Sequence, residues 1–227
     1  MYKGFFKRIF DIVSSGGALI LLSPVLFYIA YLVKTRLGSP VLFTQIRPGK
    51  DGKLFKMYKF RSMTDERDEN GELLPDDVRL TEFGKKLRAT SMDELPELIN
   101  IFKGDMSVVG PRPQLVRDMV FFTDEEMKRQ SVYPGLTGLA QICGRNNISW
   151  KEKFAYDLEY IKDINFLEDM RIIYRTVFKV SAQEDIATDG METAEDYGDW
   201  LLRTGQIDNI DYENKQKEAK ELLERFR

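Results

Sequence analysis

The stretch "FDIVSSGGALILLSPVLFYIAYLV", residues 10–33, decides how this chain relates to a membrane. Asp11 is its only charged residue. A straight helix of that length is about 36 Å long, enough to cross a hydrocarbon core of ~30 Å. However, Ser23-Pro24 lies in the middle of the run, where proline removes a backbone hydrogen bond and bends a helix. Basic residues flank the run on both sides: Lys3, Lys7, Arg8, Lys34 and Arg36. Positive flanks tend to stay in the cytoplasm, which favours both ends on that side.

Three structures fit this run. A re-entrant helix enters the membrane, bends at Ser23-Pro24 and returns, which accounts for both the proline and the basic flanks. In that structure Ser23 bonds a carbonyl that Pro24 frees. A kinked transmembrane helix and a buried core helix stay open, since real spans tolerate proline. The first arm is amphipathic, with Phe5, Ile9 and Val13 on one stripe.

The composition narrows the chemistry. The chain has 227 residues, enough for one domain with an appendage, and its net charge of −3 argues against a nucleic-acid partner. It has no histidine, which excludes a Ser-His-Asp triad, a histidine base and the usual zinc sites. Its single cysteine, Cys143, cannot form an internal disulfide, so a reducing compartment and a role as buried filler are expected.

The chain beyond residue 36 mixes strand and helix signals. Residues 40–63 predict a hairpin closed by Asp51-Gly52, a dipeptide typical of tight turns. Residues 104–116 read as a loop, and the glycine-rich segment at 133–150 contains a short strand. Helices are predicted at 79–90, 93–102, 123–132 and 151–182, the last with a break near Asn165. A final helix with Leu222, Leu223 and Phe226 packs either on the body or on a partner, so a homodimer contact is one option.

The stretch "TSMDELPELIN", residues 90–100, places two carboxylates beside each other before Pro96. Ser91 and Glu94 fit a capping box, but Pro96 would then cost a hydrogen bond in the second turn. The N-cap therefore moves to Asp93 or later, which places Asp93 and Glu94 at the positive end of a helix dipole. Phosphate and magnesium both bind at such ends, although a simple cap explains Asp93 equally well.

Several cations lie in short segments bounded by glycine, proline or a turn: Lys59, Arg61, Arg88, Arg112 and Arg145. Arginines of this kind suit phosphate oxygens, although each alone also fits a surface ion pair. In "GPRP", residues 110–113, prolines on both sides fix the backbone of Arg112.

Seven segments together resemble one family, the bacterial monotopic phosphoglycosyl transferases, also called bacterial sugar transferases. They are "KRIFDI", "SPV", "FTQIRPG", "KMYKFRSM", "LPELINIFKGDMSVVGPRP", "PGLTGLAQICGRN" and "SW". They occur in the family's order over roughly residues 5–180, and the chain is most similar to the small members, such as the transferase that starts bacillosamine-type N-glycan synthesis. The stretch after about residue 184 departs from that pattern.

The resemblance implies transfer of a sugar 1-phosphate from a UDP-sugar to undecaprenyl phosphate, with release of UMP. The family's Asp-Glu dyad falls on Asp93 and Glu94, which would act in catalysis and hold Mg²⁺. Its membrane break falls on Ser23 and Pro24. Similarity to the small members favours an N-acetylated amino sugar on UDP as the donor. The cations would bind substrate phosphates: Lys59, Arg61, Arg88, Arg112 and Arg145.

The expected fold is α+β: a re-entrant membrane helix (residues 1–36), a small, mostly helical catalytic domain with a short β-hairpin (37–183) and a C-terminal extension (184–227). The resemblance places the protein in the bacterial inner membrane, with its active site facing the cytoplasm. The alternative function is a non-catalytic membrane-anchored scaffold of a glycan pathway, which would leave the clustered arginines unexplained. A glycosidase pair fits poorly, because its two carboxylates must flank a sugar. No phosphate-binding glycine loop supports a kinase.

Overall fold

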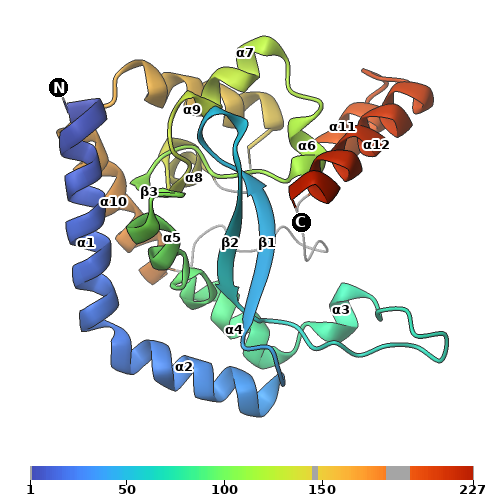
Figure 1. Cartoon of the computed structure of the whole chain (residues 1–227), viewed down its shortest axis with the longest axis horizontal. Helices are drawn as coiled ribbons and strands as arrows, with labels where there is room; N and C mark the ends of the chain where they lie inside the picture. Colours follow the sequence, from blue (N-terminus) through green and yellow to red (C-terminus); the bar gives the residue numbers. More distant parts are fainter. Residues whose placement is uncertain (1, 145–147, 183–194, 227) are drawn as a thin grey trace.

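The computed structural model describes residues 2–144, 148–182 and 195–226. A π-helical turn, η1 (Tyr2–Phe6), leads into α1 (Lys7–Leu21), and α2 (Ser23–Arg36) follows. The two helices form an L along one edge of the molecule (Figure 1). Within the described residues no single helix is long and apolar enough to cross a membrane, whereas this pair, bent by 64°, passes the same test together.

The predicted bend is present, and its cause is local. α1 ends at Leu21, and Ser23 and Pro24 form the first turn of α2, where a missing N–H costs little. In a continuous helix the N–H of residue 24 would bond the carbonyl of Ile20. The Ser23 hydroxyl donates to that carbonyl at 2.8 Å instead. The sequence prediction that Ser23 bonds a freed carbonyl is confirmed; re-entry into a membrane stays a prediction.

A β-hairpin runs through the middle of the molecule (Figure 1). β1 (Leu42–Pro48) and β2 (Leu54–Phe60) pair antiparallel, as predicted. The connection contains a short 3-10 turn, η2 (Lys50–Gly52), in which Asp51 and Gly52 have φ angles of 55° and 72°. Aspartate and glycine tolerate this left-handed region better than other residues, which is why this dipeptide closes the turn.

A second, smaller sheet was not predicted. β3 (Ser107–Val109) and β4 (Gly135–Thr137) pair in parallel. The first lies where the sequence predicted only a loop, because a three-residue strand leaves no periodicity to detect. Gly135 allows the close approach, since a Cβ there would lie 2.1 Å from the backbone nitrogen of Gly110. This sheet brings the segment that precedes Arg112 against the glycine-rich segment.

Short helices surround the two sheets. The predicted break near Asn165 is confirmed, because one long periodic region forms two helices that end and begin around it. The elements, in chain order, are α3 (Asp76–Arg79), α4 (Glu82–Ala89), η3 (Met92–Glu94), α5 (Glu97–Lys103), α6 (Val116–Met119), α7 (Asp124–Met127), η4 (Lys128–Ser131), α8 (Leu139–Cys143), α9 (Trp150–Lys162) and α10 (Phe166–Ala182). The prediction of an α+β fold is confirmed.

One face of α1 is fastened to the body by buried polar groups. Asp11 accepts hydrogen bonds from the Ser107 hydroxyl at 3.0 Å and from the backbone N–H of Val108 at 2.9 Å. Asp169 of α10 accepts from Lys7 at 2.5 Å. These partners satisfy charges that would otherwise be costly to bury.

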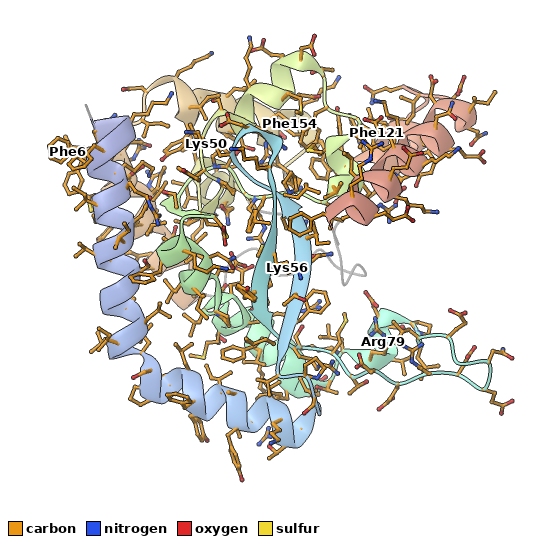
Figure 2. All side chains as sticks on the ribbon, in the orientation of Figure 1. Phe6, Lys50, Lys56, Arg79, Phe121 and Phe154 are labelled. Carbon is orange, nitrogen blue, oxygen red and sulfur yellow. The ribbon has the colours of Figure 1, made fainter. Side chains whose placement is uncertain are left out.

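The opposite face of α1 is apolar and exposed. Figure 2 shows Phe6 on the side of the helix that points away from the hairpin. Phe5, Ile9 and Val13 are exposed as well, so the stripe predicted from sequence is not part of the core. An exposed apolar stripe on a bent pair of helices favours contact with lipid.

The C-terminal extension forms two helices, α11 (Tyr197–Arg203) and α12 (Asn209–Phe226), next to α6 (Figure 1). Ala219 of α12 forms a buried cluster with Val116 and Val120, and Leu222 and Leu223 pack against this cluster. Of the two options for this helix, packing on the body is therefore present in the structure. The homodimer and the domain boundary near residue 184 stay predictions.

Candidate active site

Asp93 and Glu94 lie in η3, the single 3-10 turn that precedes α5. The N-cap was expected at Asp93 or later and lies at Pro96, since α5 begins at Glu97, so the narrower expectation that Asp93 itself caps the helix is wrong. Pro96 has no side-chain donor or acceptor. The capping box is also absent, since Ser91 has a left-handed φ of 53° and its side chain makes no cap hydrogen bond. The two carboxylates are therefore free to meet side chains from other segments.

Glu94 is held by two cations. Its Oε1 accepts from Lys59 Nζ, on β2, at 2.7 Å and from Arg112 Nη2 at 2.7 Å. Burial alone would raise the pKa of Glu94, but the charges and hydrogen bonds of Arg112 and Lys59 lower it well below its usual range. Glu94 in turn raises the pKa of Arg112 against the effect of burial. Glu94 is thus permanently ionised and fixes both cations.

Asp93 is the opposite case. It is only 8% exposed, yet among the described residues its carboxylate makes no hydrogen bond and no ion pair. Burial, together with the neighbouring charge of Glu94, raises the pKa of Asp93 to about 6. The more distant charges of Lys59, Arg88 and Arg112 pull that pKa down. Asp93 is therefore a desolvated carboxylate, mostly ionised at neutral pH, with its oxygens free to react.

A third carboxylate, Glu97, was missed by the sequence analysis. It is 2% exposed, and its Oε1 lies 3.3 Å from Lys59 Nζ without hydrogen-bond geometry. Burial raises the pKa of Glu97 to about 7. The spacing was the available signal: in "DELPE" this residue follows Asp93 by four positions and Glu94 by three, which places all three near one turn.

The predicted phosphate-binding cations have different surroundings. Arg88, on α4, donates from Nε to the Ser62 hydroxyl at 2.9 Å, and its charge acts on Asp93. Arg61, directly after β2, pairs with the exposed carboxylate of Asp65 at 2.7 Å. The structure thus brings Lys59, Arg88 and Arg112 to the carboxylates, whereas Arg61 pairs elsewhere. Arg145 lies outside the described residues.

The backbone of Arg112 is itself held by a hydrogen bond from another arginine, Arg129. Arg129 Nη2 donates to the Arg112 carbonyl at 2.6 Å, and Arg129 Nε and Nη2 both donate to Asp157 Oδ2, at 2.9 and 2.6 Å. Both members of this pair are buried. Sequence reasoning missed the pair because its members are 28 residues apart and neither lies in a suggestive motif.

This arrangement offers a nucleophile beside an anion-binding surface. Asp93 supplies a reactive oxygen, and Lys59, Arg88 and Arg112 supply positive charge around it. No group of three side chains of the metal-binding types converges within the described residues. Mg²⁺, however, commonly takes only one or two protein carboxylates and completes its shell with phosphate oxygens and water. The free carboxylate of Asp93 fits that role, whereas both cations on Glu94 compete with a metal there.

Comparison with known proteins identifies the family. The family model described as "Bacterial sugar transferase" matches residues 2–183. The chain is 47% identical over 189 residues to the uncharacterized sugar transferase EpsL of Bacillus subtilis, covering 83% of this chain and 94% of that protein.

Two longer relatives have named activities. The chain is 46% identical over 184 residues to the UDP-glucose:undecaprenyl-phosphate glucose-1-phosphate transferase of Klebsiella pneumoniae, and 38% identical over 198 residues to the undecaprenyl-phosphate galactose phosphotransferase of Salmonella typhimurium. The matches cover 77% and 80% of this chain, but only 40% and 41% of those proteins.

Proposed function

We propose that this chain, which belongs to the bacterial sugar transferase family, moves a sugar 1-phosphate from a UDP-sugar to undecaprenyl phosphate and releases UMP. The names of the two relatives above support the reaction class, since both are undecaprenyl-phosphate sugar phosphate transferases. The donor that we propose is an N-acetylated amino sugar on UDP. The product is the first membrane-bound intermediate of a bacterial glycan.

The observation that carries the proposal is the contrast within the dyad. Asp93 is buried and unpartnered in the described structure, and Glu94 is held by Lys59 and Arg112. A carboxylate tied up in two ion pairs is a poor nucleophile, whereas a desolvated carboxylate with free oxygens is a good one. Asp93 is therefore the nucleophile, and Glu94 holds the phosphate-binding cations.

The chemistry divides one displacement into two. A carboxylate oxygen of Asp93 attacks the β-phosphorus of the UDP-sugar, the bond from that phosphorus to the bridging oxygen breaks, and UMP leaves with the electron pair. An acyl phosphate carrying the sugar remains on Asp93. A phosphate oxygen of undecaprenyl phosphate then attacks the same phosphorus, and the bond to Asp93 breaks. The acceptor phosphate is already ionised near neutral pH, so a chain without histidine needs no base for this step.

Positive charge must compensate the leaving group. Arg112 and Lys59 already lie at the dyad, and Arg88 acts on Asp93, so these residues would bind donor phosphate oxygens. We propose the same role for Arg61 and Arg145. Asp93 or Glu94 would hold the Mg²⁺ that we propose as cofactor, and when bound that ion would supply positive charge at the phosphates.

The site also has to meet a lipid. The acceptor is anchored in the bilayer and the donor is soluble, so catalysis belongs at the membrane surface. The bent pair α1–α2, with its exposed apolar stripe, supports a re-entrant anchor in the inner membrane. Basic residues at both ends of the pair favour an active site on the cytoplasmic leaflet.

The test is UMP release by the purified, detergent-solubilised full chain. It would be incubated with undecaprenyl phosphate, magnesium and a panel of UDP-sugars that includes glucose, galactose and N-acetylated amino sugars. We expect release with one or a few donors and a loss of at least about a thousandfold in Asp93→Asn, because the nucleophile is gone. Asp124→Asn, which changes an exposed carboxylate on α7, is the matched control and keeps full activity.

Mass spectrometry distinguishes the remaining alternative. With donor alone, a phosphosugar adduct on Asp93 is expected in the native chain and absent in Asp93→Asn. A folded protein that gives neither UMP nor adduct with any donor would favour the non-catalytic scaffold. Removal of magnesium with a chelator should abolish release, and added magnesium should restore it.

A further inference from the structure

The C-terminal unit, defined here as residues 195–226, lies outside the region that matches the family, residues 2–183. It nevertheless docks on α6, the helix that begins four residues after Arg112. We infer that the C-terminal unit is a positioning element, which holds the backbone of Arg112 in place for binding the donor diphosphate. The inference rests on the proposed function, because it takes Arg112 to bind donor phosphate.

The first route from the C-terminal unit to Arg112 is ionic. Arg117 of α6 pairs with Asp196 and Asp199 of the C-terminal unit, each at 3.2 Å, and Arg117 Nη2 also donates to the Tyr212 hydroxyl at 3.3 Å. Next to it Asp118, which is buried, accepts the backbone N–H of Tyr197 at 2.8 Å. α6 is thus attached at two successive residues and is no longer free to shift on its own.

The second route is aromatic and reaches the Arg112 carbonyl through Arg129. The ring of Tyr197 lies 5.1 Å from that of Phe154 and 5.8 Å from that of Phe122. The Arg129 guanidinium lies over the same two rings, at 5.8 and 5.6 Å, and donates to the Arg112 carbonyl. Through Tyr197, the C-terminal unit therefore packs on the two aromatic rings that hold the Arg129 guanidinium in place.

The docking is also tight. Figure 2 shows Phe121 beside the C-terminal helices, and a Cβ at Gly198 would lie 2.5 Å from the Phe121 ring. Leu222 and Leu223 of α12 pack against the cluster that contains the buried Val116 of α6. A contact this close transmits a displacement of the C-terminal unit to α6 rather than absorbing it.

Arg112 is the residue in the site that would gain most from such support. Its side chain is 42% exposed and, among the described residues, makes a single hydrogen bond, to Glu94, so it has donors left for a phosphate. A bidentate contact from arginine to phosphate demands a fixed backbone. The prolines of "GPRP" stiffen the loop, and the two routes fix its downstream end and its carbonyl. Loss of either route should weaken the grip on the donor without touching Asp93.

The test uses the full chain and measures UDP affinity by calorimetry beside UMP release. Arg117→Gln, which removes the ionic route, should weaken UDP binding about fivefold to tenfold and leave the affinity for uridine, which has no phosphate, unchanged. Gly198→Ala, which wedges α11 away from Phe121, should do the same. Arg203→Gln is the control: it breaks an exposed pair with Glu195 inside the C-terminal unit, and both affinities should match the native chain.

A double variant separates positioning from a general loss of structure. In an Arg112→Gln background, Arg117→Gln should weaken UDP binding no further, because the residue that it positions is already gone. Additive losses, or native UDP affinity in folded Arg117→Gln and Gly198→Ala, would overturn the inference. Either result is distinct from failure of the proposed function, which would appear as a native chain that releases no UMP and forms no adduct.

Discussion

Two buried clusters of charge on this molecule are built in opposite ways. The first, called the anchor cluster, consists of Asp169, Tyr2, Lys7 and Tyr160. Asp169 is fully buried and accepts three hydrogen bonds, from Tyr2 at 2.6 Å, Lys7 at 2.5 Å and Tyr160 at 2.7 Å. In the dyad cluster Asp93 is nearly as buried, but its carboxylate has no partner among the described residues. Within the described part of the chain, Glu97 Oε1 also lacks a hydrogen bond.

The difference teaches how to separate structural from reactive carboxylates. A buried charge is tolerated when hydrogen bonds replace the water it has lost. Asp169 meets this condition, and its bond with Lys7 joins α1 to α10. Asp93 retains the cost of burial, which appears as its raised pKa. Such a cost is expected at the nucleophile that we propose, because hydrogen-bond partners would have to be removed before its oxygen could attack phosphorus.

Replacing Asp169 should produce the largest effect on stability. Asp169→Asn removes the charge that Lys7 and two tyrosines bond and leaves the buried Lys7 ammonium without the carboxylate that it bonds. We expect a loss of about 3 kcal/mol in the free energy of unfolding, measured by chemical denaturation in detergent. Adduct formation on Asp93 should survive in the fraction that stays folded. An unchanged unfolding midpoint would show that the anchor cluster does not stabilise the fold.

Replacing Asp93 should change stability in the other direction. Its folded pKa of about 6 lies above the unfolded value, so ionising it opposes folding, and this cost is absent below about pH 4 and complete above about pH 6. Asp93→Asn should therefore stabilise the protein by about 1–3 kcal/mol at pH 8 and by little at pH 4. A stability gain that does not grow with pH would contradict the assignment.

In the proposed mechanism, in which Asp93 is the nucleophile, the same pKa sets the acid limb of the reaction. Attack requires the ionised carboxylate, and with a pKa of about 6 its ionised fraction falls roughly tenfold between pH 7 and pH 5. The rate of adduct formation with donor alone should fall by that factor. An aspartate with an ordinary pKa would stay fully active at pH 5. A flat profile down to pH 5 would show that burial does not control the nucleophile.

Much of the fold could be predicted from local chemistry. The hairpin follows from Asp51-Gly52, whose positive φ angles match what those two residues allow. The bend follows from Pro24, and the exposed stripe on α1 follows from the spacing of its apolar residues. Each of these features is decided by residues within a few positions of one another, which is the range over which sequence patterns carry information.

Features that depend on distant pairing were not predictable. Lys7 and Asp169 are 162 residues apart, and the β3–β4 pairing joins two three-residue strands, so neither leaves a periodic signal. Asp93 and Glu94 were singled out because they fall on a family motif. Their different surroundings were not predicted, since nothing in the sequence indicates that Lys59 and Arg112 pair with Glu94 and not with Asp93.

The smallest expected effect is on stability and concerns the bend between α1 and α2. It tests whether the polar groups at the bend are hydrogen-bonded as fully as Asp169 is. In Ser23→Ala the Ile20 carbonyl loses the Ser23 hydroxyl, while Pro24 still offers no N–H, so we expect a loss of about 1 kcal/mol. In the double variant Ser23→Ala/Pro24→Ala, the new N–H at position 24 can bond that carbonyl and should recover the loss. The four unfolding free energies, measured in the same detergent, form a double-mutant cycle. Because the two residues act on one carbonyl, Pro24→Ala should raise the free energy of unfolding only when Ser23→Ala is also present. Independent effects of the two substitutions would mean that the Ser23 hydroxyl does not replace the bond that Pro24 removes.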